Sequence, residues 1–199
     1  MRFHRIISTI LHPIVIPTVG VMLYFLLIPN NFLKTQKFAV LSSVFIFTYL
    51  VPLFILILFK KLKVIKSYQT ESIGERKLPV ALMVILFYLL GNTMNKISNL
   101  TDLGLLFYAT SIGLLCIYIL FFFKIKASIH LLSLGIPVGF FMFLSNNYSQ
   151  SYLFVIIAFI LLSGLLASAR LHLKMHTHKE IYIGFSIGVL TPIILSYFL

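Results

Sequence analysis

Apolar residues run through this sequence in stretches of about twenty, separated by short polar connections. The stretches cover about residues 6–28, 38–59, 79–94, 103–123, 128–145, 152–169 and 181–199. Runs of this length match the hydrocarbon thickness of a bilayer, and in lipid each must be a helix, because only a helix satisfies its own backbone polar groups. The pattern therefore predicts an all-α, polytopic transmembrane helix bundle of six to seven spans, with residues 1–199 as a single transmembrane domain.

Two of these stretches are irregular. The first follows Arg2 and Arg5 like a signal peptide, but it lacks a small-x-small cleavage site and is too long, so we expect an uncleaved span. Pro13 and Pro17 should kink or delay its helix. The stretch 79–94 is the shortest, and we expect it to be the weakest span.

The composition excludes several classes of protein. The chain is 60% hydrophobic and only 10% charged, whereas a soluble domain carries about a quarter charged residues. The net charge of +12 comes from basic residues in short connections, which suits anionic lipid or phosphate and not nucleic acid. Cys116 has no second cysteine to pair with. No acidic residue lies inside a predicted span, which argues against proton-coupled transport.

The basic residues are distributed unequally between the two sides of the predicted bundle. Seven spans place the N-terminus and the connections 60–78, 124–127 and 170–180 on one side, with thirteen of the sixteen Lys and Arg. The opposite side carries three, at positions 34, 37 and 96. By the positive-inside rule the richer side faces the cytoplasm.

Three polar clusters fall on that same side, in residues 75–79, 124–130 and 169–180. Even numbers of spans separate them, so they can converge on one site. In the last cluster His176 and Glu180 are four residues apart and share a face of a helix. A carboxylate at this spacing can fix the tautomer of the imidazole and raise its basicity, as a nucleophilic histidine requires.

The other residues of the clusters suit an anionic ligand. Arg170 offers a planar fork for phosphate oxygens, if a break between helices turns it toward His176. Ser128 stands near a predicted helix N-terminus, where free N–H groups favour an anion. Lys126 and His130 are four residues apart, and His130 can serve as a general acid.

Glycine spacing predicts that the two helices after these clusters approach each other closely. Gly135 and Gly139 form one G-x-x-x-G motif, and Gly184 and Gly188 form another. Small residues at this interval let membrane helices pack backbone to backbone.

The clusters resemble the three motifs of the type-2 phosphatidic acid phosphatase family, which is related to vanadium haloperoxidases. The family motifs are K-x6-R-P, P-S-G-H and S-R-x5-H-x3-D. Here "ARLHLKMHTHKE" matches the third at Arg170, His176 and Glu180, "ASIH" matches the second at Ser128 and His130, and "ERKLP", which holds Arg76 and Lys77, resembles a degenerate first motif. The opening "IISTILHPIVIPTVG" is similar to a compact membrane branch of the kind seen in Bacteroidetes-type bacteria.

The sequence departs from the family pattern at several positions. Glu180 replaces aspartate, Ile129 replaces the motif glycine and Ala127 replaces the motif proline. Gln69 stands where the first motif has its lysine, a place that Lys126 or Lys66 could take. These changes leave open an inactive relative that binds or transports a lipid phosphate.

The resemblance implies a metal-independent membrane lipid phosphatase of the bacterial inner membrane, with no cofactor. His176 would attack phosphorus, Glu180 would orient it, and His130 would protonate the leaving oxygen. Arg76, Arg170, Ser128, Lys77 and Lys126 would hold the phosphate oxygens. The implied substrates are phosphatidate, phosphatidylglycerophosphate or a polyprenyl diphosphate. His172 and His176 could also be read as a metal pair, but the chain offers few further ligands beyond His130 and Glu180.

Overall fold

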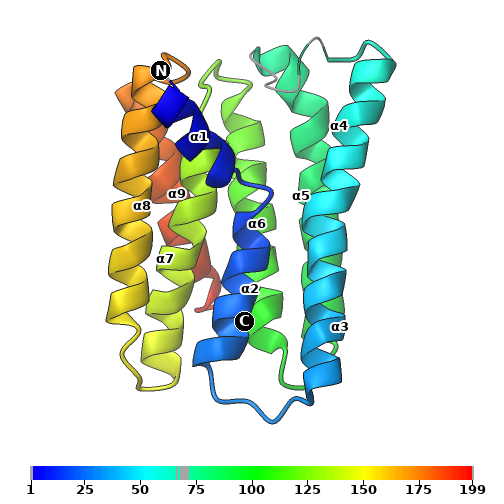
Figure 1. Ribbon diagram of the computed structural model, residues 1–199, viewed down its shortest axis with the longest axis vertical. Helices are drawn as coiled ribbons and strands as arrows, with labels where there is room; N and C mark the ends of the chain where they lie inside the picture. Colours follow the sequence, from blue (N-terminus) through cyan, green and yellow to red (C-terminus); the bar gives the residue numbers. More distant parts are fainter. Residues whose placement is uncertain (1, 66, 68–71, 199) are drawn as a thin grey trace.

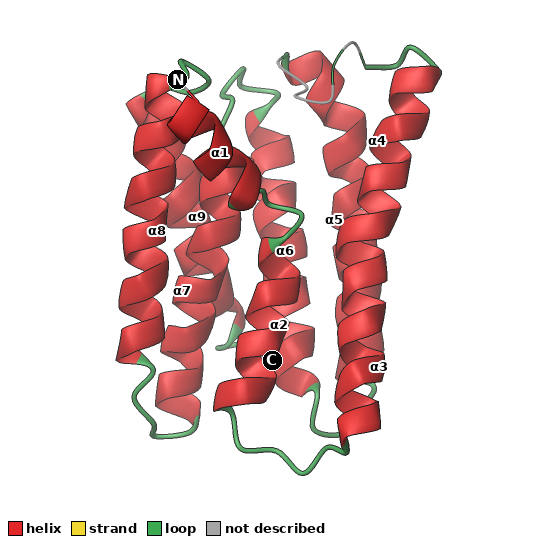
Figure 2. Cartoon of the chain, in the orientation of Figure 1, coloured by secondary structure: helices red, strands yellow, loops and turns green. Residues whose placement is uncertain are grey.

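The computed structural model describes residues 2–65, 67 and 72–198, and in them it contains helices and no strand (Figures 1 and 2). The elements, in chain order, are α1 (Arg2–Ile10), α2 (Ile16–Leu27), α3 (Lys34–Phe45), the π-helical turn η1 (Ile46–Leu50), α4 (Val51–Lys61), α5 (Ile73–Asn95), α6 (Thr101–Leu120), α7 (Ile129–Asn147), α8 (Leu153–His172) and α9 (His178–Leu195). The prediction of an all-helical bundle is confirmed.

Five helical segments of the described chain are long and apolar enough to cross a membrane. They are the 28-residue helix Lys34–Lys61, which joins α3, η1 and α4, together with α5, α6, α7 and α8. These lengths fit a hydrocarbon core of about 30 Å at 1.5 Å per residue. The chain is therefore built as a helical membrane protein, while the count of seven spans stays a prediction.

The prediction of one span over residues 6–28 is wrong. The helix stops at Ile10 and resumes at Ile16, and Figure 1 shows α1 (dark blue) lying obliquely across one end of the bundle. Pro13 falls in the break, and Pro17 falls in the first turn of α2, where a missing N–H disturbs nothing. Only the 12 residues of α2 run along the bundle.

The span predicted over residues 79–94 is longer than expected, although its mean hydropathy of 1.6 is the joint lowest of the five, in line with the prediction of a weak span. Helix α5 has 23 residues, because its N-cap is Ser72, whose side chain accepts a hydrogen bond from the backbone N–H of Glu75 at 3.3 Å. This cap adds the charged residues before Pro79 to the helix. Arg76 therefore lies on a helix that continues into the bundle.

Helices α7 and α9 pack backbone to backbone. A Cβ on Gly135 would lie 2.6 Å from the carbonyl oxygen of Phe185, and one on Gly184 would meet the carbonyl oxygen of Ser128. Each G-x-x-x-G motif thus packs against the other helix, as the spacing predicts. The start of α7 and the start of α9 are held together, and they carry the second and third polar clusters.

The polar clusters all lie at one end of the bundle. In Figure 1 the N-terminus, the end of α4, the start of α5, and the connections α6–α7 and α8–α9 are at the top. At the opposite end, the buried carboxylate of Asp102 accepts hydrogen bonds from the hydroxyls of Tyr24 (3.2 Å) and Tyr148 (2.7 Å). This contact joins α2 and α6 to the end of α7, far from the clusters.

Candidate functional site

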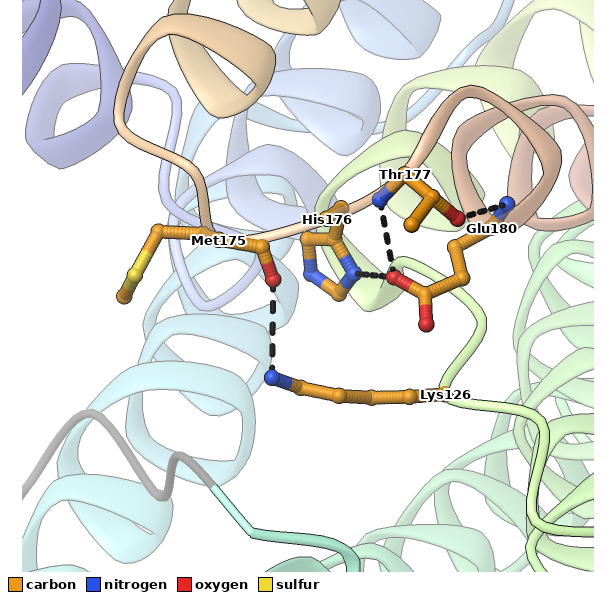
Figure 3. A network of polar contacts seen from close by, with 5 residues as sticks. All are labelled: Lys126, Met175, His176, Thr177 and Glu180. Carbon is orange, nitrogen blue, oxygen red and sulfur yellow. Dashed lines mark hydrogen bonds and ion pairs between the residues drawn. The ribbon is translucent and has the colours of Figure 1, made fainter.

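The turn between α8 and α9 holds His176 in a fixed orientation. Its Nδ1 lies 3.0 Å from Oε2 of Glu180, which also accepts a hydrogen bond from the backbone N–H of Thr177 at 3.0 Å (Figure 3). The Thr177 hydroxyl accepts in return from the backbone N–H of Glu180 at 3.4 Å, which completes a capping box at the start of α9. Glu180 therefore caps the helix and orients the imidazole with one carboxylate.

The second ring nitrogen of His176 has no such partner. The His176 side chain is 1% exposed, and its Nε2 has no hydrogen-bond partner among the described residues. Burial lowers the pKa of His176 to about 4, and the positive charges of Arg170 and Arg76 act in the same direction, against the opposing effect of Glu180. At neutral pH the ring is neutral. With Nδ1 donating its proton to Glu180, the lone pair is on Nε2.

The start of α7 is bound directly to this turn. The backbone N–H of Ser128 donates to the carbonyl oxygen of Glu180 at 3.0 Å. Lys126 extends beneath the His176 ring in Figure 3, and its Nζ donates to the carbonyl oxygen of Met175 at 3.4 Å. Ser128 is fully buried, and its hydroxyl has no hydrogen-bond partner within the described part of the chain.

A cavity of about 420 Å³ opens beside this turn. Arg76, His130 and Arg170 line its polar part, and among the described residues no acidic side chain lines it. Arg76 and Arg170 are 5% and 6% exposed, so two buried guanidinium groups face one space. Such a pair is suited to the oxygens of a phosphate group.

Electrostatic contacts join the three clusters. The positive charges of Arg170 and Arg76 act on the His130 imidazole, and the charge of Glu180 acts on Arg76. The structure thus brings together Arg76 from α5, the start of α7, and the α8–α9 turn. His176 itself does not line the cavity, although Arg170 and Met175 do.

Lys77, a predicted phosphate-binding residue, is directed away from the cavity. Its Nζ lies 5.1 Å from the ring centroid of Phe122, and Lys77 is absent from the cavity lining. Lys66, proposed as a substitute for the motif lysine, and Gln69, which stands in that lysine's place, lie outside the described residues.

The alternative of a metal pair gains no support. His172 stacks against His4, with ring centroids 4.1 Å apart. Among the described residues, no three His, Cys, Asp or Glu side chains gather where they could hold a metal ion.

Sequence reasoning missed the residues that precede and follow the break after α1. Arg5, Ser8, Thr9 and His12 line the cavity. Their spacing of three, four and seven residues from Arg5 is that of one helix face. This spacing of polar residues is visible in the sequence, but it lies inside a stretch interpreted as a membrane span.

Comparisons of the chain with family models, with curated proteins and with solved structures give no match. The link to the type-2 phosphatidic acid phosphatases rests on the residues themselves.

Proposed function

We propose that this protein is a membrane lipid phosphatase that hydrolyses a phosphomonoester or a diphosphate through a phosphohistidine on His176. The observation that carries the proposal is that each of three predicted site residues has a buried polar atom without a partner in the described chain. The atoms are His176 Nε2, Arg170 Nε and Ser128 Oγ, and of these residues Arg170 lines the cavity. Buried polar atoms are normally hydrogen-bonded, and a phosphate group offers an electrophilic phosphorus to the first and oxygens to the other two.

In the first step, the Nε2 lone pair of His176 attacks phosphorus, and the bond from phosphorus to the leaving oxygen breaks. His130, which takes up a proton when the anionic phosphate binds beside it, donates that proton to the leaving oxygen, which departs as a lipid alcohol or a lipid monophosphate. Glu180 stabilises the positive charge that forms on the His176 ring, since it already bonds Nδ1. Arg76 and Arg170 balance the charge on the equatorial oxygens.

In the second step, water attacks the phosphohistidine, and His130 accepts a proton from it. Inorganic phosphate leaves, and both histidines return to their starting forms. The nucleophile is the imidazole itself, so the proposed reaction needs no metal ion.

The mechanism requires a local displacement. His176 and Ser128 both lie outside the cavity lining, with the His176 side chain 1% exposed and Ser128 fully buried. The side chains between the cavity and these two residues must therefore shift when the phosphate enters. Met175 is the immediate neighbour of His176 that lines the cavity.

The rest of the cavity suits a lipid. Pro52, Leu56, Val80 and Met83 also line it. A second, almost wholly apolar cavity of about 110 Å³ shares Met83 and several other residues with it and extends along α2, α6 and α7. We infer that the acyl or prenyl chain lies there while the phosphate meets the arginines. The candidate substrates are phosphatidate, phosphatidylglycerophosphate and a polyprenyl diphosphate.

We also propose that the site faces the cytoplasm of a bacterial inner membrane. The argument is the distribution of thirteen Lys and Arg at the side of the clusters against three at the other.

The test is phosphate release by the purified full-length protein from each candidate lipid, with and without chelator and orthovanadate. We expect release from at least one lipid without a metal and inhibition by vanadate, which resembles the five-coordinate transition state. His176→Ala should abolish turnover, whereas His178→Ala, which alters an exposed histidine of the same helix start, should not. No release from any lipid, with phosphate still bound, would identify a binding protein without catalysis.

A further inference from the structure

The segment of residues 2–12, which consists of α1 and the turn to His12, covers the cavity and is called here the cap segment. Its polar side chains Arg5, Ser8, Thr9 and His12 line the cavity, while Ile6 and Ile10 are 55% and 64% exposed. The cap segment thus has one face toward the site and another toward the surroundings of the bundle.

Two of these side chains contact residues of the proposed machinery. The Ser8 hydroxyl, itself buried, accepts a hydrogen bond of 3.0 Å from a terminal nitrogen of Arg170. The His12 ring stands edge-on to the His130 ring at 82°, with centroids 5.2 Å apart. The backbone N–H of Ile14 donates to Nδ1 of His12 at 3.4 Å, which fixes the orientation of His12 from its other side.

We propose that the cap segment completes the phosphate site through two positioning residues, Ser8 for Arg170 and His12 for His130. Ser8 occupies one terminal nitrogen of the guanidinium and leaves Nε for the ligand. His12 limits the rotation of the His130 ring, so that the general acid faces the leaving oxygen. This inference rests on the proposed function.

The two contacts predict different kinetic defects. Ser8 acts through a group that binds phosphate in the ground state and in the transition state, so Ser8→Ala raises KM roughly tenfold, as expected for losing a hydrogen bond to a charged group. His12 acts through the proton donor, so His12→Ala lowers kcat by roughly 10- to 100-fold, part of the full effect of a general acid. Ser8→Thr, which keeps the hydroxyl, should restore KM.

The choice of leaving group separates positioning from a general structural role. A lipid alcohol needs a proton as it leaves, whereas p-nitrophenolate does not. His12→Ala should therefore lose far more activity on the lipid phosphate than on p-nitrophenyl phosphate, for which His130 is needed only to accept a proton from water in the second step. Ser8→Ala should be impaired on both substrates. Ser168→Ala and His178→Ala, at exposed positions, are the matched controls and should match the wild type.

Equal losses on both substrates for His12→Ala, or a wild-type KM for Ser8→Ala, would overturn the inference. Binding of inorganic phosphate, measured by calorimetry on the full-length protein, tests Ser8 without turnover. A wild type that binds phosphate but hydrolyses nothing would refute the proposed function. The cap role of Ser8 would still stand if Ser8→Ala weakened that binding about tenfold. A wild type that binds no phosphate, or equal affinities in both proteins, would refute the cap role.

Discussion

Gly184 in α9 is the position where one methyl group should disturb the site most directly. A Cβ there would lie 3.1 Å from both the backbone nitrogen and the carbonyl carbon of Ser128, and still nearer to its carbonyl oxygen. These are backbone atoms, which cannot turn away as a flexible side chain does. Gly184→Ala therefore has to push the start of α7 away from α9.

The expected size of the effect follows from this geometry. Overpacking of a close contact costs about 1–3 kcal/mol, which corresponds to a fall in Tm of roughly 2–12 °C for a chain of this length. Ordinary contact begins at about 3.4 Å, so relief needs a shift of several tenths of an ångström to about 1 Å. Ser128 and His130 move with α7, and His176 and Glu180 stay with α9. A misplacement of about 1 Å between reacting groups costs roughly 10²-fold in rate.

Two alanine variants serve as controls for Gly184→Ala. Gly139→Ala also overpacks the α7–α9 contact, because its Cβ meets the backbone of Val189. It lies eleven residues after Ser128, about 16 Å along the helix, so it should lower Tm while phosphate release per folded protein stays near wild type. Gly164→Ala adds its Cβ in open space on α8 and should stabilise the helix by about 0.5–1 kcal/mol.

The assays are thermal unfolding in detergent and phosphate release normalised to folded protein. If Gly184→Ala changes neither Tm nor phosphate release, the backbones of α7 and α9 are not in close contact at this position. If Gly139→Ala reduces release as strongly as Gly184→Ala does, the activity reports general stability, and the argument from local displacement is refuted.

Three further outcomes are expected. The pKa of His176 is about 4 in the folded protein against an ordinary 6.5. Between these two pH values the unfolded chain binds a proton on His176 and the folded chain does not, so the free energy of unfolding falls as the pH drops from 6.5 through 4. The Tm of the wild type should then fall more steeply over this range than that of His176→Ala, and parallel curves would contradict the assignment. Asp102→Ala should cost about 1–3 kcal/mol by depriving the buried Tyr24 hydroxyl of its acceptor, with phosphate release per folded protein unchanged; a loss of release would mean that the two ends of the bundle are coupled. Cysteines introduced at positions 62 and 147 in a Cys116→Ser background should be labelled from inside and outside the cell respectively, and the reverse would place the site on the outer face.

The relation between His176 and Glu180 could be predicted from sequence because it is local. The predicted shared helix face is not how the contact forms: His176 precedes the N-cap Thr177, and Glu180, the third residue of α9, reaches back past the cap to the imidazole. Helix geometry explains the failure of Lys77. Adjacent residues on a helix point about 100° apart, so with Arg76 in the cavity Lys77 has to point elsewhere, and it reaches Phe122. A pattern of charges alone does not separate two such neighbours.

The cap segment could not be placed from sequence because its position depends on distant contacts. Ser8 and Arg170 are 162 residues apart, and no local sequence pattern predicts that they are in contact. The apolar residues among positions 6–28 outnumber the polar face of the cap segment, so hydropathy merged two helices into one span. For α5 the prediction made the helix too short instead of too long. The charged residues before Pro79 ended the apolar run, but the cap at Ser72 started the helix earlier.

The docking of α1 on α8 also orders the events of biosynthesis. Helix α1 leaves the ribosome before α8, yet Arg170, the hydrogen-bond partner of its Ser8, is made 162 residues later. A nascent chain therefore carries an uncovered polar face on α1 until α8 is in place. The same geometry guides the placement of an affinity tag, since the N-terminus lies beside the site and α9 ends toward the other end of the bundle (Figure 1). A tag should be placed after α9, where it does not obstruct the docking of α1 on α8.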